Sequence, residues 1–181
     1  MVSQSRRGLL KFGLGAAAAS LPLMGAASAL ASAPVRRVAL HNLHTGEALN
    51  TVYWEQGRYV PQALAQVNHV LRDFRTGDVH PMDPALIDLL DALSARLDTQ
   101  NPFQVISGYR SPKTNAMLHE CTSGVASQSL HMKGLAIDIR LPGVDLDRVH
   151  RAALSLQAGG VGYYPQSDFV HVDVGPVRHW G

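Results

Sequence analysis

Residues 129–138 read SLHMKGLAID, and residues 168–173 read DFVHVD. From residue 135 of the first segment, and throughout the second, aliphatic residues alternate with a set that includes Asp138, His171 and Asp173, which predicts strands with one apolar and one polar face. Asp138 lies on the polar face of the first strand, and His171 and Asp173 lie on that of the second. Placing charged groups between aliphatic residues is costly unless their face meets water or a metal ion. The polar faces are therefore candidates for a functional site.

These two segments also offer a set of metal ligands. If the two strands are antiparallel neighbours, Asp138 and His171 converge, and His131 can approach from the loop before the first strand. Two imidazoles and one carboxylate are the ligands of a catalytic zinc site. Zinc would lower the pKa of a bound water molecule to about 7 and polarise a carbonyl, with a nearby carboxylate as base. Histidines on strands are also common as structural residues, so spacing alone leaves both interpretations open.

The remaining pattern predicts an α+β domain. Strands and helices are mixed without regular βαβ alternation, which favours a mostly antiparallel central sheet flanked by helices. Pro61 and the Asp83-Pro84 pair mark helix starts. The expected strands cover residues 35–40, 48–54, 103–109, 135–141, 161–164 and 169–174, and the expected helices cover 61–77, 84–97, 114–120 and 147–156.

The first residues have the pattern of an export signal. Arg6, Arg7 and Lys11 precede an apolar run over residues 12–27, which ends in small Ala-x-Ala-like residues. The paired arginines are typical of a twin-arginine signal. We therefore expect a signal peptide over residues 1–29, with cleavage as late as residue 33, and a single domain over 34–181 in the periplasm. The apolar run is shorter than the ~20 residues of a membrane span, so no stable span is expected after cleavage.

Charge and cysteine content narrow the function further. Three of the 16 Lys and Arg residues lie in the first 30 residues, which contain no Asp or Glu. The rest of the chain has 13 basic and 14 acidic residues, so its net charge is −1. This near-neutral charge disfavours nucleic acid as a partner. Cys121 is the single cysteine, so the domain has no internal disulfide. The oligomeric state is not indicated.

Three sequence patterns resemble one family of peptidases. The pattern Ser-x-His-x-x-Gly-x-Ala-x-Asp over residues 129–138, followed by His-x-Asp at 171–173, is similar to the motif of the zinc D-alanyl-D-alanine peptidases of the hedgehog/DD-peptidase fold. Residues 107–111, Ser-Gly-Tyr-Arg-Ser, with Asn115 beyond them, resemble the arginine segment of that superfamily. From the signal to residues 175–180, the chain resembles the exported murein endopeptidase K-like family.

The resemblance implies roles for the residues that match. His131, Asp138 and His171 would be the zinc ligands, and Arg110 would hold a carbonyl or carboxylate of the substrate through its fork of donors. A surface salt bridge is the alternative role for Arg110. We expect Ser129 to orient the His131 loop by hydrogen bonding.

The general base has two candidates. Many relatives carry an acid three residues before the last ligand, which is Asp168 here, and others use an acid just after it, which is Asp173. Strand parity favours Asp173, as base or as partner of His171, because the two residues share a face. Asp168 is also consistent with a turn residue before the strand. Trp180 either lines the cleft or fixes the C-terminal tail.

Together these features predict a zinc metallopeptidase that hydrolyses peptide cross-links of peptidoglycan. A zinc D,D-carboxypeptidase that trims terminal D-alanine and a non-catalytic wall-binding module are the alternatives. The carboxypeptidase would need a basic residue for a terminal carboxylate, and none is obvious in the sequence, although a loop could supply one. The sequence does not indicate which cross-link is cut.

Overall fold

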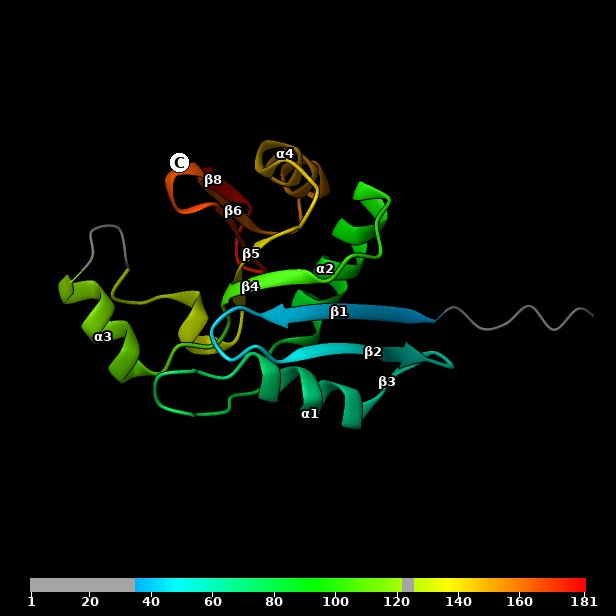
Figure 1. Cartoon of the computed structure of the whole chain (residues 1–181), viewed down its shortest axis with the longest axis horizontal. Helices are drawn as coiled ribbons and strands as arrows, with labels where there is room; N and C mark the ends of the chain where they lie inside the picture. Colours follow the sequence, from blue (N-terminus) through cyan, green and yellow to red (C-terminus); the bar gives the residue numbers. More distant parts are fainter. Residues whose placement is uncertain (1–34, 122–125) are drawn as a thin grey trace, which may run out of the picture. The chain divides into compact units, whose positions relative to one another are not determined.

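An eight-stranded sheet runs through the part of the chain that the computed structural model describes, residues 35–121 and 126–181 (Figure 1). The strand order is β3-β2-β1-β4-β5-β7-β6-β8. Neighbours are antiparallel except for the pairs β1/β4 and β6/β8, which confirms an α+β fold with a mostly antiparallel sheet. The strands are β1 (Arg36–Asn42), β2 (Ala48–Glu55), β3 (Arg58–Tyr59), β4 (Phe103–Ser107), β5 (Ala136–Arg140), β6 (Gly160–Tyr164), β7 (Phe169–Asp173) and β8 (Arg178–Trp180).

Three helices build the core against this sheet. α1 (Pro61–Val70), α2 (Pro84–Leu97) and α4 (Leu146–Leu156) bury their apolar residues in one cluster with alternate residues of the strands. α2 begins where the Asp83 carboxylate accepts a hydrogen bond of 2.8 Å from the Ala85 N–H, as an N-cap does. α3 (Pro112–Cys121) stands at one end of the sheet in Figure 1 and buries only Thr114 and Asn115.

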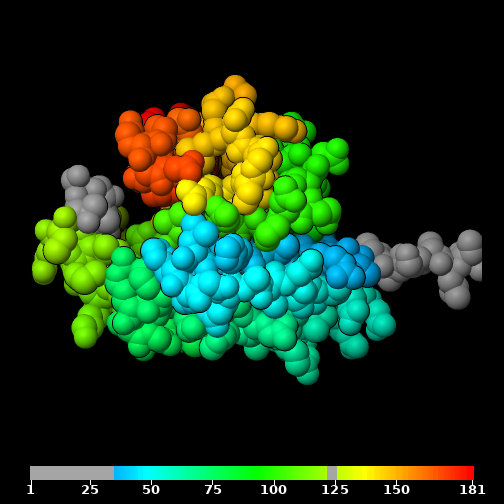
Figure 2. All heavy atoms as spheres, viewed as in Figure 1, coloured from blue at the N-terminus to red at the C-terminus, as the bar shows by residue number. Residues whose placement is uncertain are grey.

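The alternation predicted for the central strands is present. β5 directs Ile137 and Ile139 into the core, and β7 directs Val170 and Val172 there, all with at most 1% exposure. The residues between them, which include Asp138 and His171, therefore lie on the opposite face. Packing of the aliphatic residues of β5 and β7 in the core therefore fixes the positions of Asp138 and His171 on the other face. In the space-filling view the C-terminal segments, yellow to red, lie above the blue and cyan residues of β1 and β2, with green residues between them (Figure 2).

The structure differs from the sequence prediction after α1. The helix ends at Val70 and not at residue 77, because the next residues pack against the segment that carries Arg110. The Leu71 carbonyl accepts a hydrogen bond of 2.8 Å from the Tyr109 N–H, and the Asp73 carboxylate accepts one of 2.8 Å from the Ser111 N–H. These long-range bonds replace the helical ones. The short strands β3 and β8 and the 3₁₀ turns η1 (Leu130–Lys133) and η2 (Pro165–Ser167) were not predicted.

The expected signal peptide, residues 1–29 with cleavage as late as 33, lies outside the described residues, so it remains a prediction. Within residues 35–121 and 126–181, no helix is both long and apolar enough to cross a membrane.

Candidate metal centre

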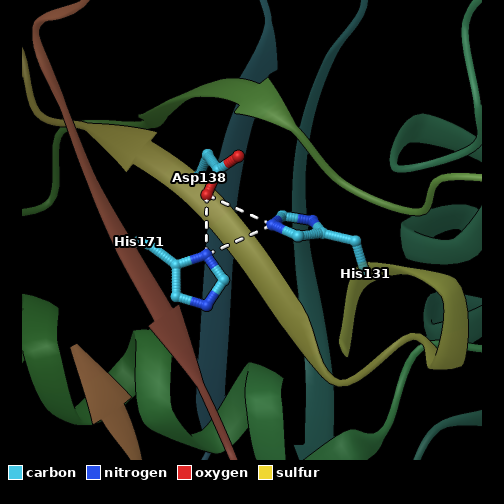
Figure 3. Close-up of side chains that lie close together, drawn as sticks. All are labelled: His131, Asp138 and His171. Carbon is cyan, nitrogen blue, oxygen red and sulfur yellow. Dashed lines mark hydrogen bonds and ion pairs between the residues drawn. The ribbon is translucent and has the colours of Figure 1, made fainter. Parts of the chain in front are cut away.

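Three buried side chains meet on the polar face of the sheet (Figure 3). Asp138 on β5 and His171 on β7 are directly paired across antiparallel strands, and His131 reaches them from η1. Asp138 Oδ1 lies 2.8 Å from His171 Nδ1 and 3.2 Å from His131 Nε2, and the two imidazole nitrogens are 3.2 Å apart. The exposed fractions of His131, Asp138 and His171 are 1%, 2% and 9%. The structure thus brings together the three residues that the sequence predicts as ligands.

A close backbone approach orients the His131 ring. Ring Nδ1 lies 2.7 Å from the Gly108 carbonyl, so Nδ1–H donates there and Nε2 presents its lone pair to the cluster. A Cβ atom at residue 108 would lie 2.5 Å from the Leu71 carbonyl oxygen, so only glycine fits at this position. Ser129 accepts a hydrogen bond of 3.3 Å from the His131 N–H, which agrees with the orienting role expected for it.

A second chain of hydrogen bonds orients His171. Its Nε2 lies 3.1 Å from Asp173 Oδ2, so Nε2–H donates to that carboxylate and Nδ1 faces the cluster. Asp173 is fully buried, and its Oδ1 also accepts hydrogen bonds from the N–H groups of Gly160 (3.0 Å) and Gly175 (2.8 Å). Arg178 Nη2 also donates a hydrogen bond of 2.8 Å to Asp173 Oδ2. Asp173 therefore occupies the position of a carboxylate that orients a histidine ligand.

The pKa values of the two imidazoles shift in opposite directions. Burial lowers the pKa of His131. Burial also opposes a charge on His171, but hydrogen bonds to Asp138 and Asp173 outweigh it and raise the pKa of that ring. Burial likewise opposes a charge on Asp138, but the neighbouring His131, His171 and Arg110 groups lower its pKa. Two buried carboxylates around two imidazoles thus form an environment that suits a cation.

The three residues fit a zinc ion by donor type and by spacing. Two imidazole nitrogens and one carboxylate oxygen are the ligand set of catalytic zinc sites, which keep a fourth position open. With zinc–ligand lengths of about 2.0–2.2 Å, the ligand atoms of a tetrahedral ion lie about 3.3–3.6 Å apart. The facing atoms are 2.8–3.2 Å apart, which is slightly shorter than this range. His131, Asp138 and His171 can therefore hold zinc through small side-chain shifts, without a change in η1, β5 or β7.

Arg110 lies directly beside the cluster. Its Nη2 donates to Asp138 Oδ2, the carboxylate oxygen that faces away from the two histidines, and its Nε donates to Ser107 Oγ at 2.8 Å. The side chain is 14% exposed and lines the same cleft as the cluster. The ion pair is therefore with a buried site residue, and not the surface salt bridge considered from the sequence.

Asp73 stabilises the segment that carries Arg110 through hydrogen bonds. Its carboxylate, 1% exposed, accepts hydrogen bonds of 2.8 Å from the Ser111 N–H and 2.9 Å from the Arg75 N–H. Burial alone would raise the pKa of Asp73, but the hydrogen bonds from Thr114, Ser111 and Arg75 lower it to about 2. Because the folded protein holds this carboxylate ionised, Asp73 stabilises the fold above the unfolded pKa of about 3.9 and loses that effect as the pH falls towards 2.

We therefore expect Asp73→Asn to lower the free energy of unfolding by about 2 kcal/mol at pH 7, since it removes a buried charge that accepts hydrogen bonds. Urea unfolding of both proteins from pH 7 to pH 2 measures the difference, which should shrink between pH 4 and pH 2. Asp78→Asn, an exposed change in the same loop, controls for the loss of one charge. A difference that is equally large at pH 2 would contradict the assignment.

Asp168 lies at the margin of the cleft. It follows η2 with a left-handed backbone (φ 53°), and its carboxylate pairs with Arg140 at 2.6 Å. The side chain is 61% exposed, and its neighbours Ser167 and Phe169 line the cleft. Of the two acids that the sequence offers as base, Asp168 is open to water and Asp173 is enclosed.

A cleft of about 480 Å³ opens over the cluster. One wall is aromatic: Trp180 lies 5.3 Å from the His171 ring between ring centres, and its Nε1 donates to Tyr164 Oη at 2.8 Å. Trp180 thus lines the cleft and also fixes the tail. Sequence reasoning missed Arg178 and Tyr164, since an arginine or a tyrosine near a chain end has no distinctive spacing. The cleft is lined by Arg110, Ala126, Gln128, Ser129, Leu130, His131, Asp138, Tyr164, Ser167, Phe169, His171, Arg178 and Trp180.

The α+β fold and the buried histidine–aspartate cluster agree with the class of zinc peptidases whose motif the sequence resembles. The chain belongs to the peptidoglycan L,D-endopeptidase MepK family, whose sequence model matches residues 30–180. It is 44% identical over 176 residues to the peptidoglycan L,D-endopeptidase MepK of Escherichia coli (strain K12) and to that of Shigella flexneri, with 97% of each chain covered. A relative from Haemophilus influenzae is 42% identical over 181 residues, which cover 99% of this chain and 97% of the relative.

Proposed function

We propose that this protein is a zinc-dependent endopeptidase that hydrolyses peptide cross-links of peptidoglycan. The observation that carries the proposal is the buried cluster of His131, Asp138 and His171 at the floor of an open cleft. The names of the family and of the E. coli relative support peptidoglycan as the substrate. They also support an amide bond between an L-centre and a D-centre as the bond that is cut.

Each residue of the site has a distinct task in this proposal. His131, Asp138 and His171 would hold the metal, and zinc supplies a Lewis acid that makes water acidic near neutral pH and polarises a carbonyl. Gly108 and Asp173 keep the two imidazoles in the tautomers that ligation requires. Arg110 supplies a guanidinium next to the cluster, where it stabilises negative charge that develops on the substrate carbonyl oxygen.

We assign the general base to Asp168. Asp173 is already the acceptor for His171, Arg178 and two backbone N–H groups, and it has no exposed surface from which to take a proton from water. Asp168 has an exposed carboxylate at the margin of the cleft. This differs from the choice that strand parity favours, because parity reports the face of a residue and not its access to solvent.

Export to the periplasm is part of the proposal. The twin-arginine pattern in residues 1–29 supports it, and peptidoglycan lies in that compartment. Cys121 is the single cysteine, so the protein has no internal disulfide. It can therefore fold in a reducing compartment before export.

Metal removal tests the reaction directly. Purified peptidoglycan sacculi are digested with the zinc-loaded protein and with protein treated with a chelator, and the released muropeptides are analysed by mass spectrometry. We expect cross-linked dimers to become monomers with the zinc-loaded protein only, with recovery when zinc is added back. Release of free alanine with intact cross-links would indicate the carboxypeptidase alternative, and binding to sacculi without any cleavage would indicate a non-catalytic module.

A further inference from the structure

Arg178 is one of two arginines that line the cleft, and it differs from the other in how its donors are used. The Arg110 side chain is 14% exposed and is engaged with Asp138 and Ser107. The Arg178 side chain is 42% exposed, lines the cleft and forms an ion pair with the buried Asp173. Asp173 has no exposed surface, so its carboxylate is screened from the cleft while the guanidinium is not.

The hydrogen bonds of Arg178 leave one edge of the guanidinium without a partner. Nη1 donates to Asp173 Oδ1 (3.2 Å) and to the Pro176 carbonyl (3.0 Å), and Nη2 donates to Asp173 Oδ2 (2.8 Å). A guanidinium has five N–H donors. Among the described residues, Nε–H and the second Nη2–H have no acceptor. These two donors are parallel on one edge, and this fork is the shape that binds a carboxylate through two hydrogen bonds.

The Arg178 guanidinium lies next to the candidate metal centre. Asp173 Oδ2 accepts from both Arg178 Nη2 and His171 Nε2, so one oxygen atom separates the guanidinium from a candidate metal ligand. Arg178 also lies over the Trp180 ring, 5.0 Å from its centre, and that ring is 5.3 Å from the His171 ring. Gly160 allows this position, because a Cβ atom there would lie 2.6 Å from Arg178 Nη1.

On the basis of the proposed function, we infer that Arg178 is a specificity-determining residue that binds a free carboxylate of the peptide stem beside the bond that is cut. A stem peptide ends in a free carboxylate, and such an anion needs a charged partner in a cleft whose walls are partly aromatic. Arg178 is the first residue of the C-terminal strand β8, so its pairing with β6 places it at the cleft.

A pair of substrates separates this role from the support that Arg178 gives to Asp173. One synthetic cross-linked peptide carries the free carboxylate, and the other carries a carboxamide at the same position. For the wild type we expect the carboxamide to raise KM and the calorimetric Kd roughly 10- to 100-fold, the cost of two charge-assisted hydrogen bonds. In Arg178→Lys, which keeps a positive charge but has no fork, the ratio between the two peptides should fall to within a few-fold of one.

Controls make the result specific. Arg151→Lys, on an exposed residue of α4, should keep the wild-type ratio. Zinc content and thermal unfolding of each variant show whether the site and the fold remain intact. An unchanged ratio in Arg178→Lys would overturn the inference even if the activity fell, since a residue that only supports Asp173 affects both peptides equally. Preferential binding of the carboxylate peptide without cleavage would uphold the inference and refute the proposed peptidase function.

Discussion

His171→Ala is expected to abolish hydrolysis of sacculi and to remove the response of the protein to zinc. The substitution takes away one of three facing ligand atoms, and the remaining pair, His131 Nε2 and Asp138 Oδ1, no longer encloses an ion. Lewis-acid catalysis contributes several kcal/mol to the stabilisation of a transition state, so the loss in kcat/KM should be on the order of a thousandfold or more. Muropeptide analysis after digestion measures this loss.

Thermal unfolding with and without zinc provides the second measurement. A metal that binds only the folded state raises the melting temperature, because it stabilises that state in proportion to the logarithm of its concentration over Kd. Zinc should stabilise the wild type and His69→Ala, an exposed histidine change on α1, but not His171→Ala. In the presence of a chelator, a cooperative transition of His171→Ala shows that it folds. Zinc-dependent stabilisation or cleavage that persists in His171→Ala would contradict the ligand assignment.

Asparagine substitutions of Asp168 and Asp173 are expected to have different effects on zinc binding and on kcat. Asp168→Asn should bind zinc as tightly as the wild type but lower kcat on the order of 10²- to 10⁴-fold, the usual contribution of a general base. Asp173→Asn should instead weaken zinc binding about 10- to 100-fold, because the His171 ring loses the carboxylate that orients it. Its activity should recover in part at high zinc concentration. Zinc titrations and single-turnover cleavage of a cross-linked peptide measure both quantities.

Arg140→Gln is the matched control for Asp168→Asn. Both changes break the same exposed ion pair, which is worth at most about 1 kcal/mol, but only one of them removes the carboxylate. Arg140→Gln should therefore have a much smaller effect on kcat. If Asp168→Asn keeps the wild-type kcat and Asp173→Asn loses activity even at saturating zinc, then Asp173 is the base, as strand parity favours.

Much of the site is predictable because strand geometry is local. The alternation in residues 135–141 and 169–174 places Asp138 and His171 on a polar face whatever the rest of the chain does. The convergence of Asp138 and His171 depended on antiparallel pairing of β5 with β7. The structure shows that pairing, with Asp138 opposite His171. The resemblance to a peptidase motif also depends on residues close together in sequence. The polar face and its candidate metal ligands can therefore be predicted from the sequence before the fold is known.

The surroundings of the ligands are not local. The difference between Asp168 and Asp173 depends on Gly160, Gly175 and Arg178, which close over one carboxylate and leave the other in water. The C-terminal residues have no periodic pattern, and they form β8 because β6 offers a free edge for parallel pairing. Arg178 enters the cleft only through that pairing.

The amino-acid sequence is enough to predict the α+β class, the helix starts at Pro61 and Pro84, and the alternation that sets Asp138 and His171 apart from the core. Contacts between distant segments set where α1 ends, which acid is enclosed and which arginine has a free edge. The reason is physical: side-chain direction along a strand follows from backbone geometry within a few residues, whereas burial and hydrogen-bond partners depend on segments brought together by folding.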